Sequence, residues 1–199
     1  MPYFEVTRNG AVETVAGALD ISTLNVHITV SDAVAAVRIG GTREKDRSYE
    51  QFQWLSDRVR PGDCIEVLYV HTTMKATPPV STSHRSFESI AELMKEVEEV
   101  QVKLNEFARR ASRVATPKSE PFTRAPRMRA LRVSTPKLGE LLASRDGEDQ
   151  LQAVINYTSA GCVVEVDTWT SREDGRSKGK RWLREELDVD GRVEVTYIA

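Results

Sequence analysis

Apolar and polar residues alternate along several short segments near the start of the chain, which is the pattern of β-strands with one buried face. Leu24–Val30 shows it most clearly: its even-numbered positions are Leu, Val, Ile and Val, and its odd-numbered positions are Asn25, His27 and Thr29. Asn9-Gly10 separates two such segments and predicts a two-residue hairpin turn. The strands predicted in this way are Pro2–Arg8, Ala11–Ala16, Leu24–Val30, Ala33–Gly40 and Cys64–His71.

A wider spacing of apolar residues predicts one helix among these strands. Phe52, Leu55 and Val59 are three and four positions apart, which places them on one face of a helix. Ser48 followed by Gln51 has the spacing of a capping box. The Pro-Gly pair that follows ends the predicted helix, because Pro fixes φ and Gly accepts the positive φ of a type II turn. One sheet with one helix on a face is a two-layer α+β module.

The last 70 residues repeat the first 70 at a nearly constant offset. Trp54-Leu55 matches Trp182-Leu183, and the strand from Ile65 to Val70 matches the one from Val193 to Ile198, at an offset of 128 (54 to 182, 65 to 193). Farther upstream the offset is 127, as in the match of Leu24 with Leu151 (24 to 151). Several matches in order indicate an internal duplication. The second copy is therefore expected to contain a helix too, near 178–187.

A long amphipathic helix is predicted between the two copies, at residues 86–114. Its apolar residues alternate at gaps of three and four, Ser89 and Glu92 form a capping box, and Pro117 follows its end. The expected fold class is α+β, with two duplicated modules joined by this helix. The predicted divisions are a first module at 1–72, a region with the loop, the helix and a Pro/Arg linker at 73–128, and a second module at 129–199.

The composition is typical of a globular protein. Of the 199 residues, 40% are hydrophobic, and 28 basic against 30 acidic residues leave a formal charge of −2. This balance argues against a dedicated nucleic-acid-binding protein. No apolar run is long enough to cross a bilayer, and the first ten residues lack the basic start and apolar core of a secretory signal. We expect a cytoplasmic protein that does not enter the membrane.

The chain carries few residues that could do chemistry. Cys64 and Cys162 lie in strand-like segments and are expected to be buried free thiols. None of the histidines, His27, His71 and His84, has a second ligand at a metal-binding spacing. No arrangement of Ser, Cys and His suggests an activated nucleophile. We therefore expect no catalytic residues, no metal and no cofactor.

The candidate partner-binding residues are charged or aromatic. Three glutamates seven positions apart form an acidic row on the predicted central helix, which could dock a basic partner or be a solvated face. Arginines in the linker could meet an acidic protein surface or belong to a solvated connection. A tryptophan could lie at an exposed turn and anchor an interface, or lie at a strand end and cover the edge of the core. These candidates are Glu92, Glu99, Glu106, Arg124, Arg127 and Trp169.

One succession of motifs resembles a known set of proteins. The motifs are Val37-Arg38-Ile39-Gly40-Gly41, then Trp54-Leu55, then Gly62-Asp63-Cys64-Ile65-Glu66-Val67. They resemble a loose group of small uncharacterised bacterial proteins with a V-x-G-G-L strand, a W-L helix and a G-D-x-I-x-I strand. Thr42 stands where the group usually has Leu, and the second copy has Asp167-Thr168 in place of the glycines. Some such proteins are thought to be encoded beside polymorphic or secreted toxins, so the resemblance implies an immunity role.

Three functions are compatible with these observations. The first is a non-enzymatic protein that binds a partner protein, in its sharper form an immunity protein that blocks a cognate bacterial toxin. The alternative is an enzyme or a small-ligand-binding protein with a site at the junction of the two modules, where clefts commonly form. The third is an assembly protein that forms a homodimer through the apolar stripe of the central helix.

Overall fold

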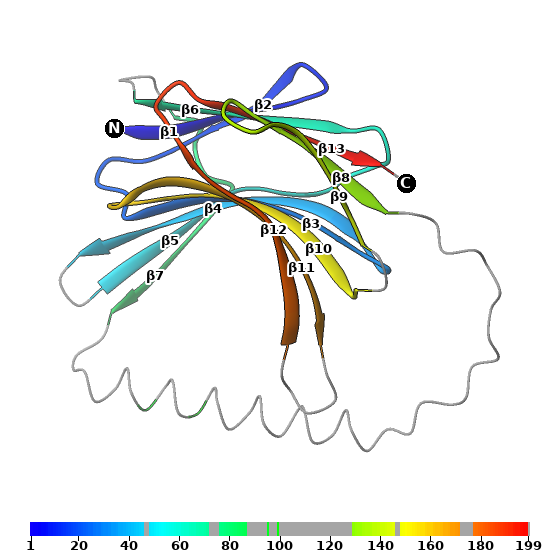
Figure 1. Cartoon of the computed structure of the whole chain (residues 1–199). Helices are drawn as coiled ribbons and strands as arrows, with labels where there is room; N and C mark the ends of the chain where they lie inside the picture. Colours follow the sequence, from blue (N-terminus) through cyan, green and yellow to red (C-terminus); the bar gives the residue numbers. More distant parts are fainter. Residues whose placement is uncertain are drawn as a thin grey trace.

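A computed structural model shows two antiparallel β-sheets stacked as two layers (Figure 1). The structure describes residues 1–45, 48–71, 76–86, 129–145, 148–171 and 177–198, and the single positions 95 and 99. Within those residues all 13 elements are strands. The architecture is therefore a β-sandwich, in which the inner faces of both sheets supply the core.

Each sheet takes strands from both halves of the chain. Sheet A has the order β2-β1-β6-β13-β8-β9, and sheet B has the order β12-β11-β10-β3-β4-β5-β7. The strands of sheet A are β1 (Pro2–Arg8), β2 (Ala11–Ala16), β6 (Cys64–His71), β8 (Ala130–Thr135), β9 (Gly139–Ser144) and β13 (Arg192–Ile198). Those of sheet B are β3 (Thr23–Ser31), β4 (Ala35–Lys45), β5 (Ser48–Arg58), β7 (Ser81–Ser86), β10 (Gln150–Thr158), β11 (Gly161–Ser171) and β12 (Ser177–Leu187).

Alternation in the sequence becomes alternation of burial in the sheets. Along β3, Leu24, Val26, Ile28 and Val30 are buried, whereas the residues between them are partly exposed. The predicted hairpin at Asn9-Gly10 is confirmed, and both residues have the positive φ, +53° and +82°, that a type I′ turn requires. The predicted bounds of β1, β2 and β6 are confirmed as well.

The two halves are related by an approximate two-fold axis that runs through both sheets. Strands β1 to β6 correspond in order to β8 to β13, and the two sets meet at β6–β13 in sheet A and at β3–β10 in sheet B. Two equivalent residues, Glu66 and Glu194, face each other across β6–β13. Likewise, His27 faces its equivalent Val154 across β3–β10. Each half completes sheets that the other half begins.

The prediction of an α+β fold is wrong, because both segments expected to form the module helices are strands. These segments are β5 and β12, and each carries a β-bulge. Ile39 pairs with Leu55 and Gly40 with Gln53, so Trp54 is the extra residue of its strand. The same shift leaves Trp182 extra in β12. A bulge changes which residues of a strand are buried, so that two apolar residues of one strand can lie three positions apart. This spacing is the same as that along one face of a helix, which explains the wrong prediction.

The segment predicted to form the long central helix, 86–114, lies almost wholly outside the described residues. Ser86 ends β7, and only the single positions 95 and 99 are described beyond it. The predicted Pro/Arg linker up to residue 128, and the homodimer contact proposed for the helix, also lie outside the described residues. Among the described residues, no helical segment combines the length and the apolar character that a bilayer crossing requires.

Candidate functional site

A groove with many polar side chains lies on the outer face of sheet B. It has a volume of about 750 Å³ and lies over five neighbouring strands, β10, β3, β4, β5 and β7. Because neighbouring strands are about 4.8 Å apart, the stretch from β10 to β5 is roughly 14 Å wide. Residues of both halves line this groove, so it lies at the junction of the two copies.

Carboxamide side chains dominate the chemistry of the groove. They occur in pairs two residues apart on β5 and on β10, and a fifth lies on β3 between those strands. Each carboxamide offers one hydrogen-bond acceptor and two donor hydrogens without a net charge. The five are Asn25, Gln51, Gln53, Gln150 and Gln152.

A glycine at the groove allows the hollow to form. Gly40 lines the groove, and a Cβ atom at this position would lie 3.2 Å from the Phe52 carbonyl oxygen and 3.6 Å from Asn25 Oδ1. The equivalent residue of the second half is Asp167, whose carboxylate accepts a hydrogen bond from Arg181 Nε at 3.1 Å. This position therefore has no side chain in the first half, whereas in the second half it carries a carboxylate that is paired with an arginine.

Arg38 and His27 are the two ionisable groups among the described lining residues. They face each other across β3–β4, and Arg38 is exposed. Partial burial, and secondly the positive charge of Arg38, lower the pKa of His27 below its ordinary value of 6.5. The imidazole is therefore neutral at pH 7 and has one nitrogen that can donate a hydrogen bond and one that can accept.

The lowered pKa of His27 predicts part of the dependence of stability on pH. The unfolded chain binds a proton at this side chain near pH 6.5, whereas the folded chain binds it only at a lower pH. The contribution of His27 to the free energy of unfolding is therefore fully present above pH 6.5 and is lost as the pH falls below that value. We expect a His27→Gln variant to lose less stability than the wild type between pH 7 and pH 5. Urea unfolding at both pH values measures this, and equal losses would contradict it.

The other half of the same sheet face is closed by ion pairs. Arg184 Nη1 lies 2.8 Å from Glu165 Oε1, and Arg181 Nη2 lies 3.5 Å from the same oxygen. Arg181 Nε lies 3.1 Å from Asp167 Oδ1. Glu165 is the equivalent of Arg38, so the two halves place opposite charges at corresponding points of sheet B. The groove is therefore a property of the first half and the junction.

Of the residues predicted to bind a partner, the structure brings Trp169 to the border of the groove. Trp169 is half-buried and pairs directly with the groove residue Gln150 across β10–β11, so both side chains belong to the same sheet face. Glu99 is one of the single described positions and is exposed. Glu92, Glu106, Arg124 and Arg127 lie outside the described residues.

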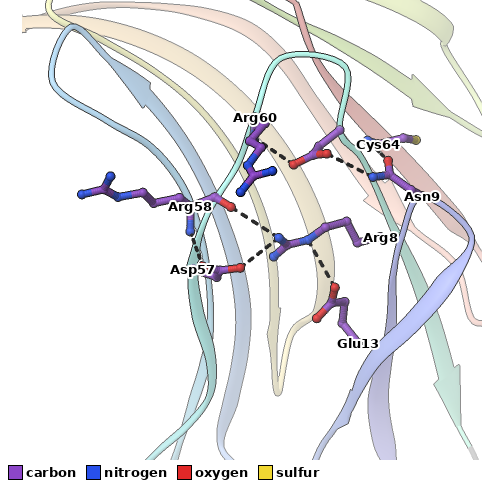
Figure 2. A network of polar contacts seen from close by, with 8 residues as sticks. Arg8, Asn9, Glu13, Asp57, Arg58, Arg60 and Cys64 are labelled. Carbon is purple, nitrogen blue, oxygen red and sulfur yellow. Dashed lines mark hydrogen bonds and ion pairs between the residues drawn. The ribbon is translucent and has the colours of Figure 1, made fainter.

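A second cavity, of about 710 Å³, lies at one end of the sandwich and contains a polar network (Figure 2). Arg8 of sheet A reaches across to sheet B, where its Nη1 atom donates to Asp57 Oδ2 at 2.9 Å and lies 3.4 Å from the Arg58 carbonyl oxygen. Its Nε atom lies 3.4 Å from Glu13. The Arg58 backbone N–H, and then Arg8, hold the pKa of Asp57 below its ordinary value.

This network connects the two sheets. The side chain of Arg8 is only 15% exposed, and its Nη2 atom is buried without a hydrogen-bond partner among the described residues, so that atom is closed to a ligand. The equivalent positions of the second half, Thr135 and Glu185, also bridge the sheets, with a 2.6 Å hydrogen bond from Thr135 Oγ1 to Glu185 Oε2. We assign this cavity to the stability of the sandwich.

The two thiols are free and differ in burial. Cys162 is buried in the core, and burial raises its pKa to about 12. Cys64 is half-buried at the start of β6, so the expected burial holds fully for one cysteine only. Within the described ranges, no group of three or more His, Cys, Asp or Glu side chains is placed to hold a metal ion.

Sequence reasoning found single parts of the groove but not the groove itself. The polar positions 25, 27 and 29 stood out as one face of a strand, and Gln150 and Gln152 have the same two-residue spacing. Their proximity depends on the pairing of β3 with β10, which lie more than 100 residues apart (150 against 31). Local patterns carry no signal for such a pairing.

Comparisons with known proteins give no further guide to the site. No family model matches the chain, and neither the curated proteins nor the solved structures contain a significant match.

Proposed function

We propose that this protein is a non-enzymatic binding protein, whose groove on sheet B holds an extended segment of a partner protein. The observation that carries this proposal is the set of five carboxamides in one groove, because each can both accept from and donate to a peptide group. A groove of this kind can hydrogen-bond the main chain of a bound segment as well as its polar side chains.

The spacing of the carboxamides favours an extended chain as the occupant. Gln51 and Gln53 lie two residues apart on β5, and Gln150 and Gln152 lie two residues apart on β10. Along a strand this separation is roughly 6.8 Å, which is also the repeat of an extended peptide that lies alongside. Trp169 at the border adds an aromatic side chain of the type that anchors protein interfaces.

The sharper form of the proposal is an immunity protein that acts in the cytoplasm by occluding a cognate bacterial toxin. This form is supported by the resemblance of residues 37–67 to bacterial proteins thought to be encoded beside toxins. Occlusion needs a surface that binds tightly and no chemistry of its own. The groove, with Trp169 beside it, is the surface that we assign to this role.

We expect a bulky side chain in the groove to abolish protection. In cells whose growth is impaired by expression of the product of the adjacent gene, the wild type should restore growth and Gln152→Trp should not, because the indole would fill the groove. Thr196→Trp is the matched control, since Thr196 is half-buried on a central strand of the other sheet.

Two outcomes would contradict this proposal at different points. If co-expression of the wild type leaves the growth defect unchanged, the immunity role is wrong for that toxin. If Gln152→Trp protects as well as Thr196→Trp does, the groove is not the binding surface. Thermal unfolding of both variants shows whether each one is folded.

A second candidate function is an enzyme or small-ligand-binding protein with its site in the same groove. The groove volume of about 750 Å³ falls within the range of small-molecule sites, and the groove lies at the junction of the halves. A small polar compound that raises the unfolding temperature of the wild type but not of Gln152→Trp would favour this alternative.

A further inference from the structure

Arg38 lacks a counter-ion within the part of the chain that the structure describes. It is exposed beside the groove, and its direct neighbours across β3–β4 and β4–β5 are His27 and Ser56. The two carboxylates of the neighbouring strand β5 form ion pairs with other arginines. Glu50 lies 2.7 Å from Arg43, and Asp57 lies 2.9 Å from Arg8.

In the second half, the arginines on the same sheet face form ion pairs with carboxylates of the chain itself. There, Arg181 and Arg184 share the carboxylates of Glu165 and Asp167 at 2.8–3.5 Å. The first half has Arg38 where the second has Glu165, and Gly40 where the second has Asp167. The first half thus has neither carboxylate, an arginine takes the place of one of them, and a glycine that lines the groove takes the place of the other.

The groove therefore has a positive group and uncharged hydrogen-bonding groups around it. Among the described residues that line it, Arg38 is the one permanently charged side chain, and the other polar groups are carboxamides, hydroxyls and the His27 ring. A guanidinium can bind a carboxylate through two parallel N–H···O bonds. Carboxamides beside such a pair can hydrogen-bond the backbone that carries the carboxylate.

We infer that the segment held in the groove is acidic, and that an Asp or Glu carboxylate of the partner pairs with Arg38. This inference rests on the proposed function, since it names the chemistry of the segment that the groove holds. The partner supplies the charge that Glu165 and Asp167 supply in the second half. Arg38 is thus the specificity-determining residue of the groove.

Selection from a display library of random twelve-residue peptides tests this with the full 199-residue chain. We expect the wild type to enrich peptides that contain Asp or Glu, and Arg38→Gln to lose that enrichment. Arg184→Gln is the matched control, because it removes an arginine from the same sheet face while Glu165 keeps Arg181 as a partner. It should select the same peptides as the wild type.

A double-mutant cycle then isolates the ion pair. In a selected synthetic peptide, a change of the acidic residue to its amide should weaken binding to the wild type about tenfold or more, and binding to Arg38→Gln by less than about twofold. The wild-type affinity should also fall with added salt. Arg38→Gln should unfold at the same temperature as the wild type, because Arg38 is exposed.

The outcomes separate the inference from the proposed function. The inference would be overturned if the selected peptides lose binding to Gln152→Trp but are not acidic. It would also be overturned if they bind Arg38→Gln as well as they bind the wild type. In both cases the proposed function would stand. Acidic peptides that depend on Arg184 and not on Arg38 would overturn it also. If the wild type enriches no peptide, the proposed function and the inference both fail.

Discussion

Phe4→Ala should lower the free energy of unfolding by about 3–5 kcal/mol, the largest effect that we expect from one substitution in this chain. Phe4 is fully buried on β1, and its ring contacts Tyr69 edge-on with ring centroids 5.9 Å apart. Truncation to Ala removes the apolar side chain and leaves a cavity that strands on both sides hold open. Because domains are stable by only about 5–15 kcal/mol, the variant would be close to unfolding.

Two control variants make this prediction sharp. Phe4→Leu should cost less than about 1.5 kcal/mol, because Leu131 occupies the equivalent position of the second half and is also fully buried. Val12→Ala, on the neighbouring strand β2, should change the stability by less than about 0.5 kcal/mol, since Val12 is 63% exposed. Urea unfolding followed by circular dichroism measures all three. A loss for Phe4→Ala no larger than that for Val12→Ala would refute the packing described for β1.

Gly41→Ala should lower the free energy of unfolding by about 1–3 kcal/mol through overpacking, although Ala has the smallest side chain that can replace Gly. A Cβ atom on Gly41 would lie 2.6 Å from the Thr23 carbonyl oxygen and 2.8 Å from Ile21 Cδ1. The first of these is a backbone atom, so it cannot move without distorting β3. The smaller number of conformations of the unfolded chain would offset only about 0.4–1 kcal/mol of the cost.

The adjacent glycine provides a graded comparison. At Gly40 the nearest atom to a new Cβ is 3.2 Å away, so Gly40→Ala should destabilise the protein less than Gly41→Ala does. For a chain of this size, each 1 kcal/mol corresponds to roughly 2–4 °C in the midpoint of thermal unfolding, so calorimetry can rank the two variants. If Gly41→Ala were as stable as the wild type, the close approach of β4 to Thr23 would be wrong.

The parts of the fold that could be predicted from sequence are those set by residues close together in the chain. Asn9-Gly10 defines a hairpin because these two residues accept positive φ, and the alternation in β3 and β6 follows from one buried face. The helices predicted at β5 and β12 failed because a bulged tryptophan in each strand changes which residues face inward. Periodicity alone cannot tell such a bulge from a helical turn.

The candidate site was beyond sequence reasoning for a different reason. The pairing of β3 with β10, and of β6 with β13, joins segments from opposite ends of the chain. A polar face on one strand is ordinary on its own. It becomes a site only when Gln150 and Gln152 are placed beside the polar face of β3 and the glycine at position 40.

The approximate two-fold axis has a consequence for how this sandwich could acquire a one-sided site. A chain with only one half would leave β3 and β6 with bare edges, and two identical copies could cover those edges by pairing as a symmetric dimer. In such a dimer every change to one copy appears twice. Fusion of the copies into one chain removes that constraint, so that one position can hold an arginine and its twin a glutamate, as Arg38 and Glu165 do.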